Sequence, residues 1–138
     1  MDDITYEING DFSVDEFRDI LKSSGLAQRR PVNDLECIKG MVKNANLTVV
    51  AKDGIKIVGV ARSVTDFHYC CYLSDIAVDE GYQHLGIGKT LIRKTKEELG
   101  NRCKIILLSA PAATEYYPKI GFGKHNQAWI LDENDVLK

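Results

Sequence analysis

The feature that most constrains this chain is a β-strand that runs through a glycine-containing loop directly into a helix. Leu73–Val78 is rich in β-formers, Asp79–Gly88 is rich in turn residues, and a helical period begins at Lys89. Glycines let backbone amides approach a ligand, and the amides of a helix's first turn lack acceptors within the helix. The junction therefore predicts a binding site for a phosphate or pyrophosphate group.

Two common phosphate-binding motifs fit this junction poorly. Gly88-Lys89-Thr90 matches the end of a nucleotide-binding P-loop, but Gln83 stands where that motif needs its first glycine. The apolar stretch that follows ends in Ser109, where a metal-holding acid would be expected. The dinucleotide fingerprint Gly-x-Gly-x-x-Gly is absent. A third pattern, Gln83-x-x-Gly86-x-Gly88, fits the junction better than either.

Periodicity along the rest of the chain predicts alternating strands and helices. A capping box at Ser13 and Glu16 starts one helix, a similar pattern at Asn33 starts a second, and Asp53-Gly54 marks a hairpin turn. Two further helices are expected over 89–99 and 112–119, and strands over 4–8, 47–51, 55–64, 69–78, 104–109 and 128–131. Of these strands, 69–78 is expected to be central and 104–109 to be buried. This order indicates one α/β domain over residues 1–138, a mixed, mostly antiparallel twisted sheet flanked by helices.

Composition excludes several classes of protein. The chain has 138 residues, 44% of them hydrophobic and 28% charged, which suits one folded domain and not a disordered chain. A net charge of -2 gives no basic field for nucleic acid, and no apolar stretch approaches the roughly 18 residues of a membrane span. The acidic start Met1-Asp2-Asp3 is unlike a secretory signal, so we expect a cytoplasmic protein.

The cysteines and histidines form no recognisable metal or redox motif. Cys37, Cys70, Cys71 and Cys103 include no C-x-x-C pair, and the three histidines are dispersed along the chain. We therefore expect no metal site and interpret the cysteines as reduced, buried, small hydrophobic residues.

Two motifs in the right order resemble the GNAT superfamily of N-acetyltransferases. One is the run Val78-x-x-x-x-Gln83-His84-Leu85-Gly86-Ile87-Gly88-Lys89, and the other is Tyr116-Tyr117-Pro118-Lys119-Ile120-Gly121-Phe122. The resemblance covers essentially the whole chain, and residues 75–122 carry its distinctive part. It implies the acyl-CoA N-acyltransferase fold and direct transfer of an acetyl group from acetyl-CoA to a primary amine in a ternary complex, without a metal. Ala110 departs from the family pattern, which often has an asparagine there; Ser109 is the neighbouring polar residue.

The resemblance assigns the glycine-containing loop to the pyrophosphate of acetyl-CoA. The residues so implied are Gln83, His84, Leu85, Gly86, Ile87, Gly88, Lys89 and Thr90. It also implies that the strand at Ile76, Ala77 and Val78 pairs with the pantetheine arm and that Lys119 lies near the cofactor. Charge agrees with a polyanionic ligand, because residues 83–104 carry a net +4 and the rest of the chain -6. The structural alternative is that Gly86 and Gly88 only form a tight turn and that the charges only face water.

The second motif supplies a candidate general acid. In the family, the tyrosine at the position of Tyr117 often protonates the CoA thiolate as it leaves, and a phenol is largely protonated at neutral pH. Tyr116 remains an alternative, because adjacent residues on a helix point about 100° apart. The resemblance also implies that the Ile76 amide donates a hydrogen bond to the thioester oxygen as negative charge develops there. Phe122 is expected in the core.

The general base is left open by the sequence. Asp75 is the available carboxylate, but simple alternation along a strand places it on the face opposite Tyr72, Ser74 and Ile76. A bulge, which the family often has here, would break that count. We favour a chain of waters through Tyr72 or Ser74 over Asp75 itself.

The acceptor is not defined by the sequence. We expect a small-molecule amine, or a lysine or N-terminal amine, and the acidic remainder of the chain is compatible with a cationic acceptor. A homodimer is an expectation from the family. A hypothesis of a different class is a non-catalytic acyl-CoA-sensing or protein-interaction module on the same fold, whose function a Tyr117→Phe substitution would leave intact.

Overall fold

A computed structural model describes residues 3–138 of the chain, which form two compact units, one up to Leu108 and one over Ser109–Lys138. Residues 1 and 2, where the acidic N-terminus begins, lie outside the described residues. The expectation of a single domain over residues 1–138 stays a prediction.

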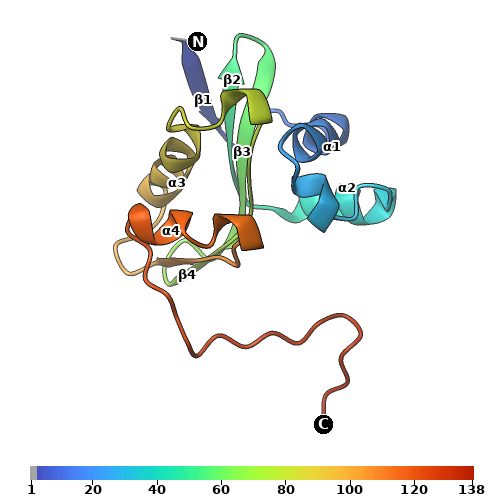
Figure 1. The fold of residues 1–138 in the computed structure, drawn as a ribbon, viewed down its shortest axis with the longest axis vertical. Coiled ribbons are helices and arrows are strands. Elements are labelled where there is room, and N and C mark those ends of the chain that lie inside the picture. The colour runs from blue at the N-terminus through green and yellow to red at the C-terminus, as the bar shows by residue number, and fades with distance from the viewer. Residues whose placement is uncertain (1–2) are drawn as a thin grey trace. The chain divides into compact units, whose positions relative to one another are not determined.

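A five-stranded sheet forms the centre of the first unit (Figure 1). Its strands lie in sequence order: β1 Ile4–Ile8, β2 Leu47–Asp53, β3 Lys56–Thr65, β4 Cys70–Val78 and β5 Lys104–Ile106. Neighbours from β1 to β4 are antiparallel, and β5 pairs in parallel with β4. The mixed, mostly antiparallel sheet is therefore confirmed, with β4 as an interior strand.

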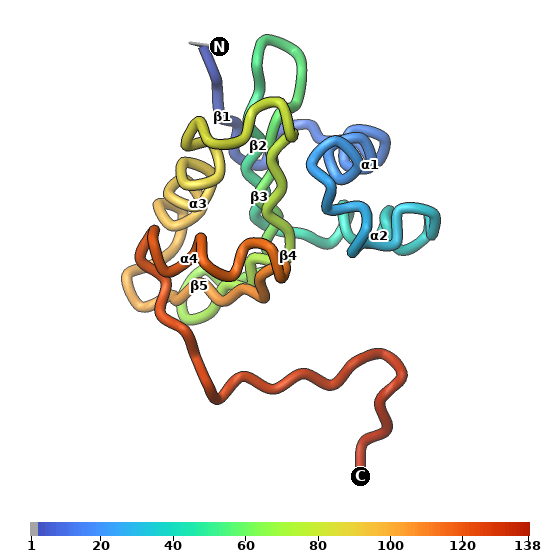
Figure 2. Tube along the Cα trace, in the orientation of Figure 1, coloured from blue at the N-terminus to red at the C-terminus, as the bar shows by residue number. Residues whose placement is uncertain are grey.

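Helices cover both faces of this sheet. On one face lie α1 Val14–Ser23 and α2 Leu35–Asn44, joined through the 3-10 turn η1 Leu26–Arg29, and on the other lies α3 Ile87–Glu97 (Figures 1 and 2). The predicted capping box starts α1: the Glu16 amide donates to Ser13 Oγ at 3.0 Å, and the Ser13 amide donates to Glu16 Oε1 at 2.9 Å.

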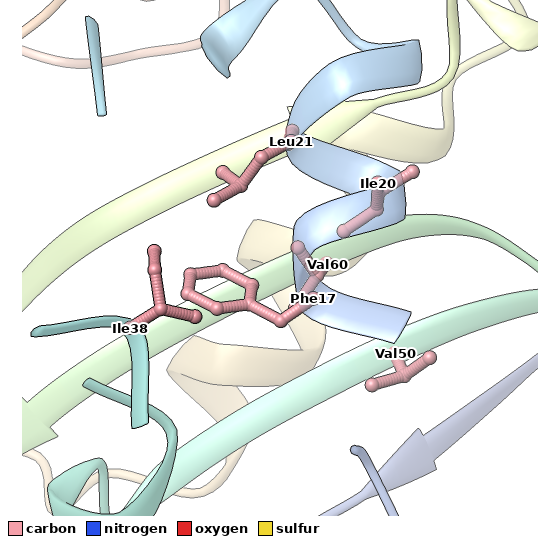
Figure 3. Close-up of a cluster of buried hydrophobic side chains, with 7 residues drawn as sticks. Phe17, Ile20, Leu21, Ile38, Val50 and Val60 are labelled. Carbon is pink, nitrogen blue, oxygen red and sulfur yellow. The ribbon is translucent and has the colours of Figure 1, made fainter. Parts of the chain in front are cut away.

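The core under α1 and α2 is built from the predicted apolar stripes (Figure 3). Its buried members are Phe17, Ile20 and Leu21 of α1, Ile38 of α2, Val50 of β2, Val60 of β3 and Ala77 of β4. Burying one large apolar side chain of this kind stabilises the fold by about 2 kcal/mol. Because Ala77 belongs to this cluster, the core fixes the C-terminal half of β4.

The other face of the sheet holds α3 close to β3. Ile87, Leu91, Ile92 and Thr95 of α3 are buried. A Cβ added at Gly59 would lie 3.1 Å from both Ile87 Cγ2 and Leu91 Cδ1. The missing side chain at Gly59 therefore lets the first turns of α3 pack directly on the sheet.

Two helix starts differ from the sequence prediction. The N-cap of α2 is Asp34 and not Asn33, since Asp34 Oδ1 accepts from the Cys37 amide and its negative charge favours a helix N-terminus. Helix α3 starts at Ile87, two residues before the predicted Lys89. Gly88 has a low helix propensity, so the sequence pattern predicts a later start for this helix. In the first turn a glycine destabilises the helix less, because the amides there make no backbone hydrogen bond within the helix.

The predicted buried strand 104–109 is wrong in length and burial. It ends at Ile106, its last pair being Tyr72↔Ile106, and Ile106 is 48% exposed. β5 is an edge strand whose only partner is β4, and after Ile106 the chain no longer pairs with β4, although β4 continues to Val78.

The second unit contains less regular structure than predicted. In place of a helix over 112–119 there is a 3-10 turn η3 Pro111–Ala113 and a short helix α4 Tyr116–Lys119. Pro118 lacks the N–H that a continuous helix would bond to Thr114, and its ring clashes with that carbonyl. The predicted strand 128–131 is not formed; its backbone has no ladder partner, and Trp129 is 94% exposed.

The cysteine prediction is half correct. All four cysteines are free thiols; Cys71 and Cys103 are buried, whereas Cys37 and Cys70 are exposed. No helix among residues 3–138 combines the length and apolarity needed to cross a membrane.

Candidate functional site

The N-terminus of α3 presents free backbone donors. Its N-cap is Gly86, at φ +82°, and no side chain caps the helix within the described residues. The first backbone bond of the helix runs from the Thr90 amide to Gly86 O at 3.0 Å, so the amides of Ile87, Gly88 and Lys89 have no acceptor within the helix. The partial positive charge of a helix N-terminus adds to these donors, and together they suit an anionic group.

The loop before α3 is anchored at its start and exposed at its end. Tyr82 Oη donates to Asp53 Oδ2 at 2.7 Å, which raises the pKa of Tyr82 and ties the 3-10 turn η2 Glu80–Tyr82 to the β2–β3 hairpin. Gln83 Nε2 donates to Val78 O at 3.1 Å. Residues 83–86 are exposed, and His84 joins Gly86 in the left-handed region with φ +66°. The structure therefore brings the predicted pyrophosphate-binding residues together at an accessible turn.

The C-terminal half of β4 has a free edge. β5 pairs with β4 only as far as Tyr72, so from Leu73 to Val78 the strand has a ladder partner only in β3. The Asp79 amide donates to Val58 O at 2.9 Å, so by alternation the peptide groups of Ala77 face β3 while those of Ile76 and Val78 face the free edge. The Ile76 backbone and the Val78 amide can therefore pair with an extended ligand, whereas Val78 O accepts from Gln83 Nε2 and the Ala77 backbone is directed to β3.

A bulge at Ser74 interrupts the pairing of β3 and β4. Arg62 pairs with Asp75, but the next β3 residue, Ser63, pairs with Leu73, which leaves Ser74 as the extra residue. Because Val64 pairs with Tyr72, the side chains of Tyr72 and Asp75 share the α1–α2 face. The simple alternation count is thus corrected by the bulge, as the sequence analysis allowed.

Asp75 lies at the centre of a buried ionic cluster. Its side chain is fully buried, with Oδ1 accepting from Arg30 Nε and Oδ2 accepting from Arg62 Nε. Arg30 Nη2 also donates to Ser74 O at 2.8 Å, and Arg62 Nη2 donates to Ser74 Oγ at 3.0 Å. Both oxygens of the candidate base are therefore occupied, and its side chain has no exposed path to an amine.

The candidate acid lies in the second unit. Tyr117 is buried on α4, where its ring makes edge contacts with Tyr116 at 5.2 Å and Phe122 at 5.5 Å between centroids. Burial raises the pKa of both Tyr116 and Tyr117, which keeps the two phenols protonated at neutral pH. Lys119 is exposed on the same short helix. Of the two tyrosines, Tyr116 is the more exposed, at 38%.

Two arginines that contact Asp75, Arg30 and Arg62, are not among the residues predicted for the site. The signal for Arg62 is a charged residue that directly follows the apolar run of residues 57–61 within a strand, because a buried cation needs a partner. Arg30 carries no such signal, because it lies in a loop 45 residues from Asp75. Residues 3–138 contain no cluster of histidine, cysteine and carboxylate side chains arranged to hold a metal ion.

The sequence and the fold of this chain are similar to those of known proteins. The family model of the acetyltransferase (GNAT) family matches residues 12–122. A histone acetyltransferase, TAP1 of Glycine max, is 27% identical over 135 residues; the alignment covers 88% of this chain but only 57% of that protein. A putative acetyltransferase from Deinococcus radiodurans R1 has a similar structure, with a TM-score of 0.74, 19% identity and coverage of 95% of this chain and 89% of its own. The aminoglycoside N-acetyltransferase AAC(6')-Iy in complex with CoA superposes with a TM-score of 0.72 at 15% identity, over 96% and 95% of the two chains.

Proposed function

The chain belongs to the GNAT family of acetyltransferases, and on that premise we propose that it transfers an acetyl group from acetyl-CoA to a primary amine. The observation that carries this proposal is the geometry at the end of β4. A helix N-terminus without a side-chain cap follows the free strand edge after the loop of residues 79–86. A pyrophosphate followed by an amide-containing arm fits such an arrangement, because one end needs N–H donors and the other needs a strand-like partner.

The loop and the first turn of α3 would hold the pyrophosphate. The amides of Ile87, Gly88 and Lys89 point their donors toward it, and the exposed Lys89 ammonium adds charge. Thr90 Oγ1 donates to Gly86 O at 2.9 Å, so it supports the turn. The Ile76 backbone and the Val78 amide would pair with the pantetheine arm along the free edge of β4, while Val78 O accepts from Gln83.

Three groups of the chain would assist the transfer: an oxyanion donor, a general acid and a path for the proton of the amine. The Ile76 amide donates to the thioester oxygen as negative charge develops on it, and Tyr117 protonates the sulfur as it leaves. The role of Tyr117 rests on its match to the family motif and on the raised pKa that keeps its phenol protonated. For the base we propose a water chain through Tyr72 or Ser74 in preference to Asp75, whose carboxylate oxygens both accept from arginines.

The acceptor class is supported by relatives only in outline. One relative is named a histone acetyltransferase and a structural neighbour an aminoglycoside N-acetyltransferase. Both names refer to acceptors that carry amines, and we therefore propose an amine acceptor for this chain without naming the molecule. Cytoplasmic location and homodimer formation stay predictions.

The first test is isothermal titration of the full chain with acetyl-CoA, with ATP plus magnesium and with NADH as controls. The proposal expects saturable binding of acetyl-CoA alone. Binding of ATP alone would replace it with the P-loop interpretation, and the absence of any binding would contradict it.

The second test separates an enzyme from a non-catalytic acyl-CoA-binding module. A panel of amines is screened for release of free CoA thiol, and Tyr117→Phe is compared with Tyr116→Phe. Removing the general acid should reduce kcat by about a hundredfold with little change in affinity for acetyl-CoA. Loss of turnover in Tyr116→Phe instead would move the acid to Tyr116, and unchanged turnover in both variants would remove a tyrosine acid from the mechanism.

A further inference from the structure

We propose that Arg30 and Arg62 are positioning residues that, paired with Asp75, hold the Ser74 bulge of β4 and so fix the direction of the Ile76 amide. This inference rests on the proposed function, because the Ile76 amide is the group assigned to the thioester oxygen. It gives Asp75 a role other than that of general base.

The two arginines serve the polar groups that the bulge leaves without ladder partners. The extra residue of a bulge loses its regular cross-strand bonds. Ser74 O accepts from Arg30 Nη2 at 2.8 Å and Ser74 Oγ accepts from Arg62 Nη2 at 3.0 Å. The carbonyl and the hydroxyl of the bulge residue are thus each held by a different guanidinium group.

Each arginine also ties the bulge to the helical layer. Arg62 Nη1 donates to Met41 O at 3.1 Å. This carbonyl lies in the last turn of α2, where carbonyl groups accept no hydrogen bond from the helix itself. Arg30 directly follows η1 and donates through Nη1 to Arg29 O at 2.8 Å. Asp75 joins the two arginines, with side-chain exposures of 20% for Arg30, 0% for Asp75 and 7% for Arg62.

The position of the bulge decides which peptide groups reach the free edge of β4. Shifting the register of a strand by one residue turns each of its peptide groups to the opposite side. With the bulge at Ser74, residues from Asp75 to Val78 stay in one register with β3, the Ala77 side chain packs in the core and the Ile76 amide faces the free edge. If the bulge moved past Ile76, that amide would face β3 instead. A clamp on Ser74 therefore acts on the thioester end of the ligand site and not on the pyrophosphate end.

Arg30→Gln tests this inference, because Arg30 is the most exposed member of the cluster. Affinities for CoA and for acetyl-CoA are measured by titration, since only acetyl-CoA carries the thioester carbonyl. The amide resonance of Ile76 is followed in ¹⁵N spectra. We expect CoA affinity to stay within about twofold of wild type, while acetyl-CoA affinity relative to CoA falls about fivefold, the value of one hydrogen bond. The Ile76 resonance should split or shift.

Arg29→Gln is the matched control, because it removes the same charge from the adjacent exposed residue, whose side chain makes no hydrogen bond within the described residues. It should leave both the affinity ratio and the Ile76 resonance unchanged. If Arg30→Gln does not fold, Arg30→Lys takes its place. A single ammonium can pair with Asp75 but cannot also reach Ser74 O in the manner of a guanidinium, so the same loss is expected.

The inference is overturned if folded Arg30 variants keep the wild-type affinity ratio and the wild-type Ile76 resonance. It is also overturned if CoA and acetyl-CoA affinities fall in equal proportion, which is the result of a purely structural role. Failure of the wild-type protein to bind either ligand is a different result, and it contradicts the proposed function itself.

Discussion

Gly86 shows how one residue can serve the fold and the ligand site together. Its φ of +82° lies in the left-handed region, although a Cβ there would meet no atom within 4 Å. Gly86→Ala should therefore lower the free energy of unfolding by about 1 kcal/mol through backbone strain alone. It should also weaken CoA binding, because relieving the strain rotates the amides at the start of α3.

Gly40→Ala is the matched control for this prediction. Gly40 lies inside α2, and the nearest atom to an added Cβ is 4.0 Å away. The same substitution should raise the free energy of unfolding there by about 0.5–1 kcal/mol and leave CoA affinity unchanged. Urea unfolding and CoA titration measure both quantities; an equal effect at the two glycines would contradict the role of the positive φ.

Asp66 gives the fold a pH dependence at the β3–β4 turn. Its Oδ1 accepts from the amides of His68, Tyr69 and Cys70, and these bonds lower the pKa of Asp66 from 3.8 to about 2. A lowered folded-state pKa stabilises the fold above the unfolded value, and this contribution is lost as the pH falls toward 2. Asp66→Ala should therefore be less stable than wild type at pH 6, and the difference should shrink between pH 4 and pH 2. Urea unfolding at each pH measures it, and a constant difference would disprove the link.

The turn before α3 could be located from the sequence, whereas the ionic cluster around Asp75 could not, and the difference has a physical reason. Gln83, Gly86 and Gly88 follow one another in a local motif, and their geometry depends on a turn of a few residues. The ionic cluster instead joins Arg30 to Asp75 across 45 residues and depends on the bulge at Ser74. The family resemblance allowed a bulge in this strand, but the apolar pattern does not mark its position, so the contacts that depend on the bulge at Ser74 could not be predicted.

At the scale of elements, the sequence predicted those helices and hairpins that carry a local signal, such as a capping residue, an apolar stripe or a turn dipeptide. α1 carries a capping box and a buried stripe, and the β2–β3 hairpin carries an Asp-Gly turn. Residues 104–109 and 128–131 have the composition of strands, but a strand also needs a neighbour to pair with. For β5 the pairing with β4 stops at Tyr72, and for 128–131 there is no partner within the described residues; sequence periodicity reveals neither fact.

The packing of α3 on β3 gives an element-scale prediction. A Cβ at Gly59 would lie 3.1 Å from atoms of Ile87 and Leu91, so Gly59→Val should push the first turns of α3 away from the sheet. We expect a loss of about 1–3 kcal/mol in the free energy of unfolding and a weaker affinity for CoA. Gly59→Ala should show both effects to a smaller extent, because only the far ends of two side chains must move. If Gly59→Val is destabilised but keeps the wild-type affinity for CoA, the prediction is contradicted, and the packing of α3 on β3 does not control the ligand site.

At the scale of the whole chain, β4 connects the two ends of the proposed ligand site, the thioester end and the pyrophosphate end. Its C-terminal half is fixed by the core through Ala77, its bulge is held by Arg30 and Arg62, and its end leads into α3. Perturbing the core should therefore change both halves of the ligand site, whereas perturbing the clamp should change only the thioester half. Because the core and the ligand site share β4, a substitution that affects only one end of the strand distinguishes the thioester end of the site from the pyrophosphate end.

Charge distribution over the whole chain predicts how CoA binding responds to salt. Residues 83–104 carry a net +4 in a chain of net charge -2, and exposed charges act on a polyanion through solvent that salt can screen. CoA affinity should fall as the salt concentration rises. Lys89→Gln should lower the affinity about threefold at low salt and flatten the salt dependence, because Lys89 lies in the first turn of α3. Lys96→Gln, in the last turn and about 10 Å further along the helix, should change both much less. Equal effects of the two substitutions would show that only the overall charge matters and that the ligand does not bind at the start of α3.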